Sequence, residues 1–131
     1  MDKELVLSAI INYFKSRPEV ACAYLFGSFG TEDFIEGISD IDIAVIPKDH
    51  SSELFDTERL QLDLESLLNC SMDVCDLLYL KKDILYDVYL REECFYGRDS
   101  EERVKALELF EMYLRNNHVF EYYMNSYTET Y

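Results

Sequence analysis

Leu25-Phe26-Gly27-Ser28, followed after a connector by Ser39-Asp40-Ile41-Asp42-Ile43-Ala44-Val45, is the part of the sequence that decides the predicted fold. An apolar strand ends in a Gly-Ser turn, and a second strand then carries two acids at alternate positions. Residues two apart in a strand share a face, so Asp40 and Asp42 are expected to project together, while the isoleucines beside them point into a core. Two adjacent carboxylates repel each other unless a cation or a shared proton compensates them, so the pattern indicates a divalent-metal site.

The composition is that of a globular protein. The chain has 131 residues, of which 49% are apolar and 30% are charged, which predicts one domain with a single core. The longest apolar run, residues 20–26, is too short to span a membrane. Residues 1–4 start acidic and lack the basic and apolar regions of a signal peptide, so we expect a cytoplasmic location.

The formal net charge of −15 limits the possible partners. It argues against direct binding to nucleic acid, where basic contacts supply the affinity, and favours a cationic partner or a bound metal. An acidic surface that only keeps the protein soluble is the alternative. The four cysteines (Cys22, Cys70, Cys75 and Cys94) lack C-x-x-C spacing and are expected to be free thiols, mostly buried.

Apolar spacing and cap residues predict helices that alternate with short strands. The predicted elements are a helix over 2–16 capped by Asp2, a strand over 20–26, a strand over 39–46, a helix capped by Ser51 or Ser52 and running to 68, a strand over 72–80, a helix over 82–91, a short strand over 94–96 and a helix over about 99–124 with Asp99 and Glu102 in capping-box spacing. The apolar positions expected to face inward on the second and last helices are Leu54, Leu60, Leu64, Leu67, Leu68, Val104, Leu107, Phe110 and Leu114. This order predicts an α/β (α+β) fold with a small mixed sheet of three to four strands flanked by helices.

The Gly-Ser turn and the acids together indicate a nucleotide-and-metal site. Gly27 and Ser28 offer backbone N–H groups and a hydroxyl without bulk, which suits phosphate binding, and one helical turn is possible directly after them. Magnesium is commonly held by one or two carboxylates plus substrate phosphates. A third acid could come from the next strand, where Asp73 and Asp76 point to opposite faces. Each signal alone is weak, but their combination favours this site over a solvated acidic loop.

The G-S…D-x-D pattern of Gly27-Ser28 and Asp40-Ile41-Asp42 resembles the signature of the DNA polymerase β-like nucleotidyltransferase superfamily. Size and element order are similar to its minimal nucleotidyltransferases (the MNT family), over roughly residues 5–115. The resemblance implies that residues 1–131 form one such domain. It further implies that Asp40, Asp42 and Asp73 are catalytic and hold two magnesium ions. Gly27, Ser28 and Ser39 would bind ATP, although Ser39 also suits a hydrogen-bonding role at the start of a strand.

The resemblance also implies a function, because small members of this family act as antitoxins beside HEPN-domain RNase toxins. The chain would transfer AMP from ATP to a tyrosine of the toxin, with Asp73 deprotonating the acceptor hydroxyl. The system would be type VII-like, and the two proteins would form a hetero-oligomer without membrane or nucleic-acid contact. The spacing of Arg115 and His118 does not match the HEPN pattern, so this chain is not the toxin.

Two other functions remain open at this point. No Lys or Arg lies between Arg17 and Lys48, and the connector carries Glu32, Asp33 and Glu36, which would oppose a triphosphate. A degenerate antitoxin or adaptor that inhibits its partner by binding alone is therefore one alternative. Nucleotide transfer to a small molecule is another, although it usually needs a second domain.

The remaining candidate residues have simpler interpretations. Asp76 is expected to support the strand edge rather than bind a metal, and His50 and His118 are expected at the surface. The tyrosine-rich tail from residue 125 is expected to fray. The aromatic residues near the end of the chain form either a partner surface or helix packing followed by that tail: Phe120, Tyr122, Tyr123, Tyr127 and Tyr131.

Overall fold

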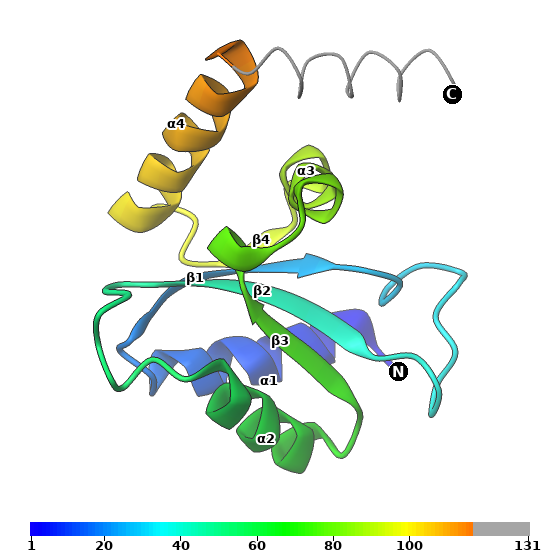
Figure 1. Ribbon diagram of the computed structural model, residues 1–131. Helices are drawn as coiled ribbons and strands as arrows, with labels where there is room; N and C mark the ends of the chain where they lie inside the picture. Colours follow the sequence, from blue (N-terminus) through cyan, green and yellow to red (C-terminus); the bar gives the residue numbers. More distant parts are fainter. Residues whose placement is uncertain (117–131) are drawn as a thin grey trace.

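The computed structural model describes residues 1–116, which form a four-stranded sheet between two layers of helices (Figure 1). The elements are α1 (Lys3–Lys15), β1 (Val20–Phe26), β2 (Ile41–Pro47), α2 (Thr57–Leu68), β3 (Met72–Asp76), the 3₁₀ helix η1 (Leu77–Tyr79), α3 (Lys82–Arg91), β4 (Cys94–Tyr96) and α4 (Glu101–Asn116). This arrangement confirms the predicted α/β class and the small mixed sheet. The predicted end of the last helix, His118, the aromatic residues from Phe120 and the tail lie outside the described residues.

The sheet has the strand order β3-β2-β1-β4. β1 is antiparallel to both of its neighbours, whereas β2 and β3 are parallel and are joined by the α2 crossover. Parallel strands need such a crossover because the chain must return to the end of the sheet at which the first strand began. β1 lies inside the sheet with six of its seven residues buried, as its continuous apolar run predicts for a strand covered on both faces.

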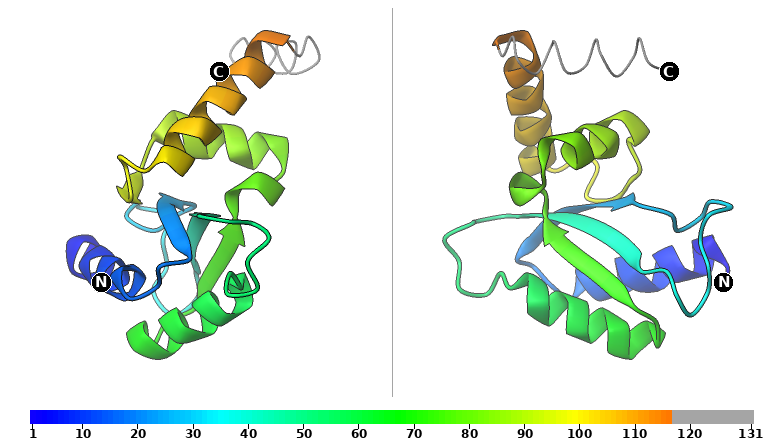
Figure 2. Two further views of the ribbon diagram at one scale, coloured as in Figure 1. Left: turned by 90° about the vertical axis from the view of Figure 1, so that its left-hand side faces the viewer. Right: turned by 45° about the vertical axis from the view of Figure 1, so that its right-hand side comes forward.

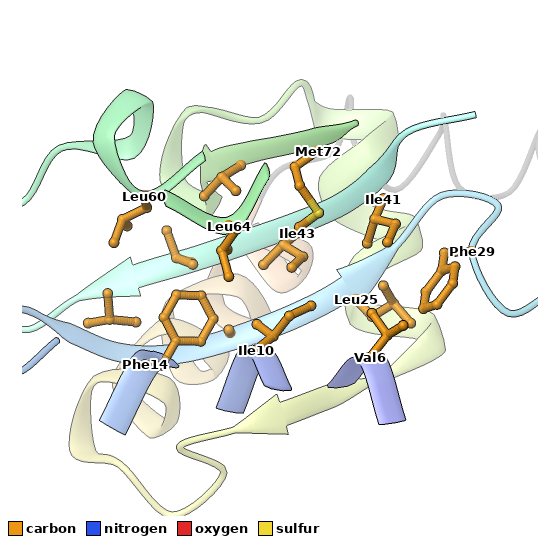
Figure 3. Close-up of a cluster of buried hydrophobic side chains, with 14 residues drawn as sticks. Val6, Ile10, Phe14, Leu25, Phe29, Ile41, Ile43, Leu60, Leu64 and Met72 are labelled. Atoms are coloured by element: carbon orange, nitrogen blue, oxygen red, sulfur yellow. The ribbon is translucent and has the colours of Figure 1, made fainter. Parts of the chain in front are cut away.

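α1 and α2 cover one face of the sheet (Figures 1 and 2). On α1, the buried residues Val6, Ile10 and Phe14 are four positions apart, so they form one apolar stripe. α2 contributes Leu60 and Leu64, and all five side chains point at the apolar residues of β1, β2 and β3 (Figure 3). This layer holds β1, β2 and β3 together and so fixes the strand ends that carry the candidate site.

α3 and α4 cover the opposite face. Tyr89 of α3 stacks on Phe110 of α4, with ring centroids 4.1 Å apart and planes 16° apart. Cys22 and Cys94 are buried, whereas Cys70 and Cys75 are half-buried, and all four are free thiols. In the part of the chain that the structure describes, no helix is long and apolar enough to cross a membrane.

The predicted start of the second helix was wrong. α2 begins at Thr57, and its cap is the Asp56 carboxylate, which accepts hydrogen bonds from the N–H groups of Glu58 and Arg59. Ser51 and Ser52 instead lie in hydrogen-bonded turns that follow Asp49. Two leucines expected to face inward are exposed: Leu54 at 70%, which lies before α2, and Leu67 at 57%, near the end of the helix.

Two further boundaries differ from the prediction. β3 ends at Asp76 because its carboxylate accepts the Leu78 N–H and starts η1, so the strand does not continue to residue 80. The Ser100 hydroxyl accepts the Arg103 N–H at the start of α4, so Asp99 and Glu102 do not form the expected capping box. Val104, expected to face inward, is 46% exposed, and Ala106 is buried in the core beside Phe110.

The corrected cap gives a test of local stability. Asp56→Ala removes the acceptor for two α2 amides and should lower the free energy of unfolding by about 1 kcal/mol. Ser52→Ala is the matched control, because its hydroxyl accepts a single exposed turn amide, from Leu54. Urea unfolding of both variants checks this, and an equal loss in the two variants would contradict the assignment.

Candidate nucleotide site

Gly27 places the candidate site at the end of β1. Its φ of +72° lies in the left-handed region, which glycine adopts without a steric penalty. A Cβ at this position would overlap Oδ2 of Asp42, so the carboxylate occupies the space that a side chain would need. The Gly-Ser turn and the second acid of the D-x-D pattern are therefore in direct contact.

Asp42 is the centre of the acidic cluster. In the sheet it pairs with Phe26 of β1 on one side and with Asp73 of β3 on the other. Burial, and then the neighbouring carboxylates of Asp73 and Asp40, raise the pKa of Asp42 to about 6. The structure thus brings the carboxylates of Asp73 and Asp40 close enough to Asp42 to raise its pKa.

The other two acids are more accessible than Asp42. Asp40 precedes β2 by one residue and is exposed, because β2 starts at Ile41 rather than at Ser39 as expected. Asp73 is the second residue of β3 and is also exposed. Half-buried Asp42 therefore lies between two carboxylates that face solvent, where they are accessible to a metal cation and the substrate bound to it.

Asp76 does not belong to this cluster. It lies opposite Val45 in the sheet, three residues beyond Asp73, and is 8% exposed. Its Oδ2 is 2.9 Å from Nε2 of His50, and its Oδ1 accepts the Leu78 N–H. These contacts give Asp76 a structural role, although the paired His50 could not have been identified from sequence spacing.

The two predicted serines have different surroundings. The carbonyl of Ser28 accepts the N–H and the hydroxyl of Thr31, which closes the turn. The Ser39 hydroxyl accepts the Ile35 N–H at 3.0 Å, so it organises the connector next to the site. The residues directly after Gly27 and Ser28 form turns and not the helical turn considered from the sequence. Any phosphate contact there therefore depends on turn amides.

Three residues that the sequence analysis missed support the turn. Nη1 of Arg91, at the end of α3, donates a 2.6 Å hydrogen bond to the Gly27 carbonyl. Nη2 of Arg91 and Nζ of Lys3 lie 3.4 and 3.5 Å from the same oxygen of Glu93. The start of α1 lies beside the connector between β1 and β2 (Figure 2). Sequence spacing gives no signal for these contacts, because Arg91 is 64 positions from Gly27.

The acids fit a metal ion only in part. Within residues 1–116, no group of three or more His, Cys, Asp or Glu side chains is gathered so that it could hold a metal ion. The carboxylates of Asp73 and Asp40 nevertheless lie close enough to Asp42 to raise its pKa, together with burial. Magnesium needs only one or two carboxylates when substrate phosphates supply the remaining oxygens. The donor set therefore fits magnesium that binds together with a nucleotide.

The Gly27–Asp42 contact predicts a position-specific effect of added volume. Gly27→Ala and Gly37→Ala both place alanine at a positive φ, but a Cβ on Gly37 has nothing within 4 Å. We expect Gly27→Ala to lower the free energy of unfolding by about 1 kcal/mol more than Gly37→Ala, because the Asp42 side chain must move. Urea unfolding in an Asp42→Ala background should remove most of this difference, because only the Asp42 Cβ, 3.1 Å away, remains. A difference of the same size there would contradict the contact.

The raised pKa of Asp42 predicts a pH dependence of stability in metal-free protein. Ionising Asp42 costs stability as the pH rises from its ordinary pKa of 3.8 to about 6, and the full cost remains at higher pH. Asp42→Asn should therefore be more stable than the wild type above pH 6, by about 1 kcal/mol after allowing for solvent screening, and similar to it near pH 4.

Thermal melts with a chelator across this pH range would measure the effect. Asp99→Asn is the control, because Asp99 is exposed and precedes α4. A gain for Asp42→Asn that is the same at every pH would contradict the crowding of these carboxylates.

Several solved structures resemble this chain in fold. A chain in a crystal structure described as the toxin-antitoxin MntA-HepT is 24% identical, with a TM-score of 0.59 over 93% of this chain and 99% of that chain. A chain in a toxin-antitoxin structure with AMP-PNP is 24% identical, with a TM-score of 0.60 over 90% and 98%. A chain in a structure of a tri-AMPylated Shewanella oneidensis HEPN toxin with its MNT antitoxin is 23% identical, with a TM-score of 0.59 over 94% and 99%.

These structures share the fold of this chain. The chain matches no curated protein in sequence. The family model described as polymerase beta, nucleotidyltransferase, matches residues 8–101, which include the Gly-Ser turn and all three acids. The chain therefore belongs to the polymerase beta nucleotidyltransferase family.

Proposed function

We propose that this chain is an antitoxin that transfers AMP from ATP to a tyrosine of a HEPN-domain toxin and so neutralises it. The observation that carries the proposal is the Asp42 carboxylate, which contacts the Gly27 turn and lies beside Asp40 and Asp73. A phosphate-binding turn and a cluster of acids are the two parts that nucleotidyl transfer requires. Here the turn and the acids are in direct contact through Asp42 and Gly27, rather than at separate places on the surface.

Each site residue has a role in the proposed reaction. The N–H of Ser28 and the backbone of the Gly27 turn would bind phosphate oxygens, and Ser39 would keep the adjoining connector in place. Asp40, Asp42 and Asp73 would hold magnesium, which supplies positive charge to the triphosphate and relieves the repulsion among the acids. Exposed Asp73 would also accept the proton of the attacking tyrosine hydroxyl. The tyrosine oxygen forms a bond to the α-phosphorus of ATP. The bond between that phosphorus and the pyrophosphate oxygen breaks at the same time, and pyrophosphate leaves.

The structural neighbours support the toxin as the acceptor. One neighbour structure contains AMP-PNP, an ATP analogue, and another contains a tri-AMPylated HEPN toxin with an MNT antitoxin. The net charge of −15 is a second argument, because an acidic protein associates favourably with a basic RNA-cleaving partner. The chain and the toxin would form a hetero-oligomer.

Intact-mass spectrometry tests the proposed transfer. The chain is incubated with ATP, magnesium and the HEPN-domain protein encoded beside it, and the partner should gain the mass of one or more AMP groups. Asp42→Asn should reduce the transfer rate by about a thousandfold or more, because it removes a charge at the reacting phosphates. Asp99→Asn, the same chemical change at an exposed position, should transfer normally. Equal transfer by both variants would overturn the role of Asp42.

Inhibition by binding alone is the second candidate function. Its support is the connector, where Glu32, Asp33 and Glu36 are exposed close to the turn and would repel a triphosphate. In this case the chain would inhibit the toxin without ATP, and the Asp40→Asn, Asp42→Asn double variant would inhibit as well as the wild type. An RNase assay with and without ATP separates the two functions.

A further inference from the structure

Arg91 ties the end of α3 to the candidate phosphate turn. Its Nη1 donates to the Gly27 carbonyl at 2.6 Å, a short distance for a charge-assisted hydrogen bond. Its Nη2 lies 3.4 Å from Oε2 of Glu93. One guanidinium group thus holds a backbone carbonyl and a carboxylate together, which its planar fork allows and the single ammonium group of a lysine does not.

Glu93 fixes Arg91 in place from the other side. The Glu93 carbonyl accepts the Leu25 N–H at 2.9 Å, so this segment is attached to the last residues of β1. Oε2 of Glu93 is buried and forms no hydrogen bond, and its neighbours are the cations of Arg91 and Lys3. Two cations around one carboxylate leave an excess of positive charge beside the turn.

These basic groups come from outside the segment of the chain that forms the turn. No Lys or Arg occurs between Arg17 and Lys48, the segment that contains β1, the turn, the connector and β2. The Lys3 side chain crosses Gly30, where Nζ would be 3.2 Å from a Cβ. The fold therefore brings basic groups to the turn from α1 and α3, while the turn's own segment supplies only acids.

The hydrogen bond from Arg91 also fixes the direction of a neighbouring donor. The Gly27 carbonyl and the Ser28 N–H belong to one planar trans peptide, so they point in opposite directions. With the carbonyl held toward Arg91, the Ser28 N–H is directed away from Arg91. Within residues 1–116 this N–H donates to no other group, so it is available to a ligand.

We propose that Arg91 is a positioning residue that holds the Gly27 peptide in the orientation in which the Ser28 N–H binds a nucleotide phosphate. This inference rests on the proposed nucleotide-binding function. Arg91 acts through Gly27 and through its charge, without itself touching the nucleotide. Glu93 orients the guanidinium group, and Lys3 adds positive charge beside it.

Two variants and one control test this role. Arg91→Met removes both the hydrogen bond and the charge, whereas Arg91→Lys keeps the charge but not the two-pronged contact. Arg59→Met is the matched control, because Arg59 is an exposed arginine on α2 that pairs with Asp63 one turn away. Isothermal titration with ATP and magnesium gives the affinities, and the ¹⁵N–¹H signal of Ser28 reports the peptide orientation.

Arg91→Met should bind ATP about tenfold more weakly than the wild type, the size expected for one hydrogen bond to a charged group. Its Ser28 signal should shift even without nucleotide, while Arg59→Met changes neither quantity. Arg91→Lys should recover part of the affinity but not the wild-type Ser28 signal. A general loss of stability would not produce this pattern in variants that remain folded.

The outcomes separate this inference from the proposed function. If wild-type protein binds no ATP, the proposed function is overturned, and the Ser28 signal of the free protein still tests Arg91. If Arg91→Met binds ATP as tightly as Arg59→Met, or keeps the wild-type Ser28 signal, the positioning role is overturned. Should Arg91→Met fail to fold, Arg91→Lys decides by the same two measurements.

Discussion

The contact between the Asp42 carboxylate and the backbone of Gly27 is the constraint on which the site depends. It requires glycine at a positive φ, because any side chain there would displace the carboxylate. It also requires β1 and β2 to be antiparallel neighbours in the register that pairs Phe26 with Asp42. The apolar layer of α1 and α2 holds that register, so core packing and site geometry are two consequences of one arrangement of strands.

The same contact brings negative charges together, and the nearby positive charges come from Lys3 and Arg91, outside the segment that contains the turn and β2. Burial, and then the carboxylates of Asp73 and Asp40, raise the pKa of Asp42, so these acids repel one another in a way that a bound cation would relieve. On the other side of the turn, Arg91 and Lys3 meet at Glu93. The turn thus lies between an acidic cluster suited to cations and a basic group suited to phosphate.

The sequence allowed most of the fold and the proximity of the acids to be predicted, because these depend on local patterns. The continuous apolar run identified β1, and the helical spacing of apolar residues identified α3, both with their observed bounds. The alternation of Asp40 and Asp42 indicated a shared site. The α2 cap was missed because Ser52 and Asp56 are both good cap residues, and only packing decides between them. Arg91 was missed because a hydrogen bond across 64 positions leaves no periodic signal.

A crystal structure with AMP-PNP and manganese would test the central claim most directly, because manganese can replace magnesium and is located by its anomalous scattering. We expect a manganese peak at the carboxylates of Asp40, Asp42 and Asp73, with a phosphate oxygen at the Ser28 N–H. A nucleotide bound away from the Gly27 turn, or manganese bound without contact to Asp42, would contradict it.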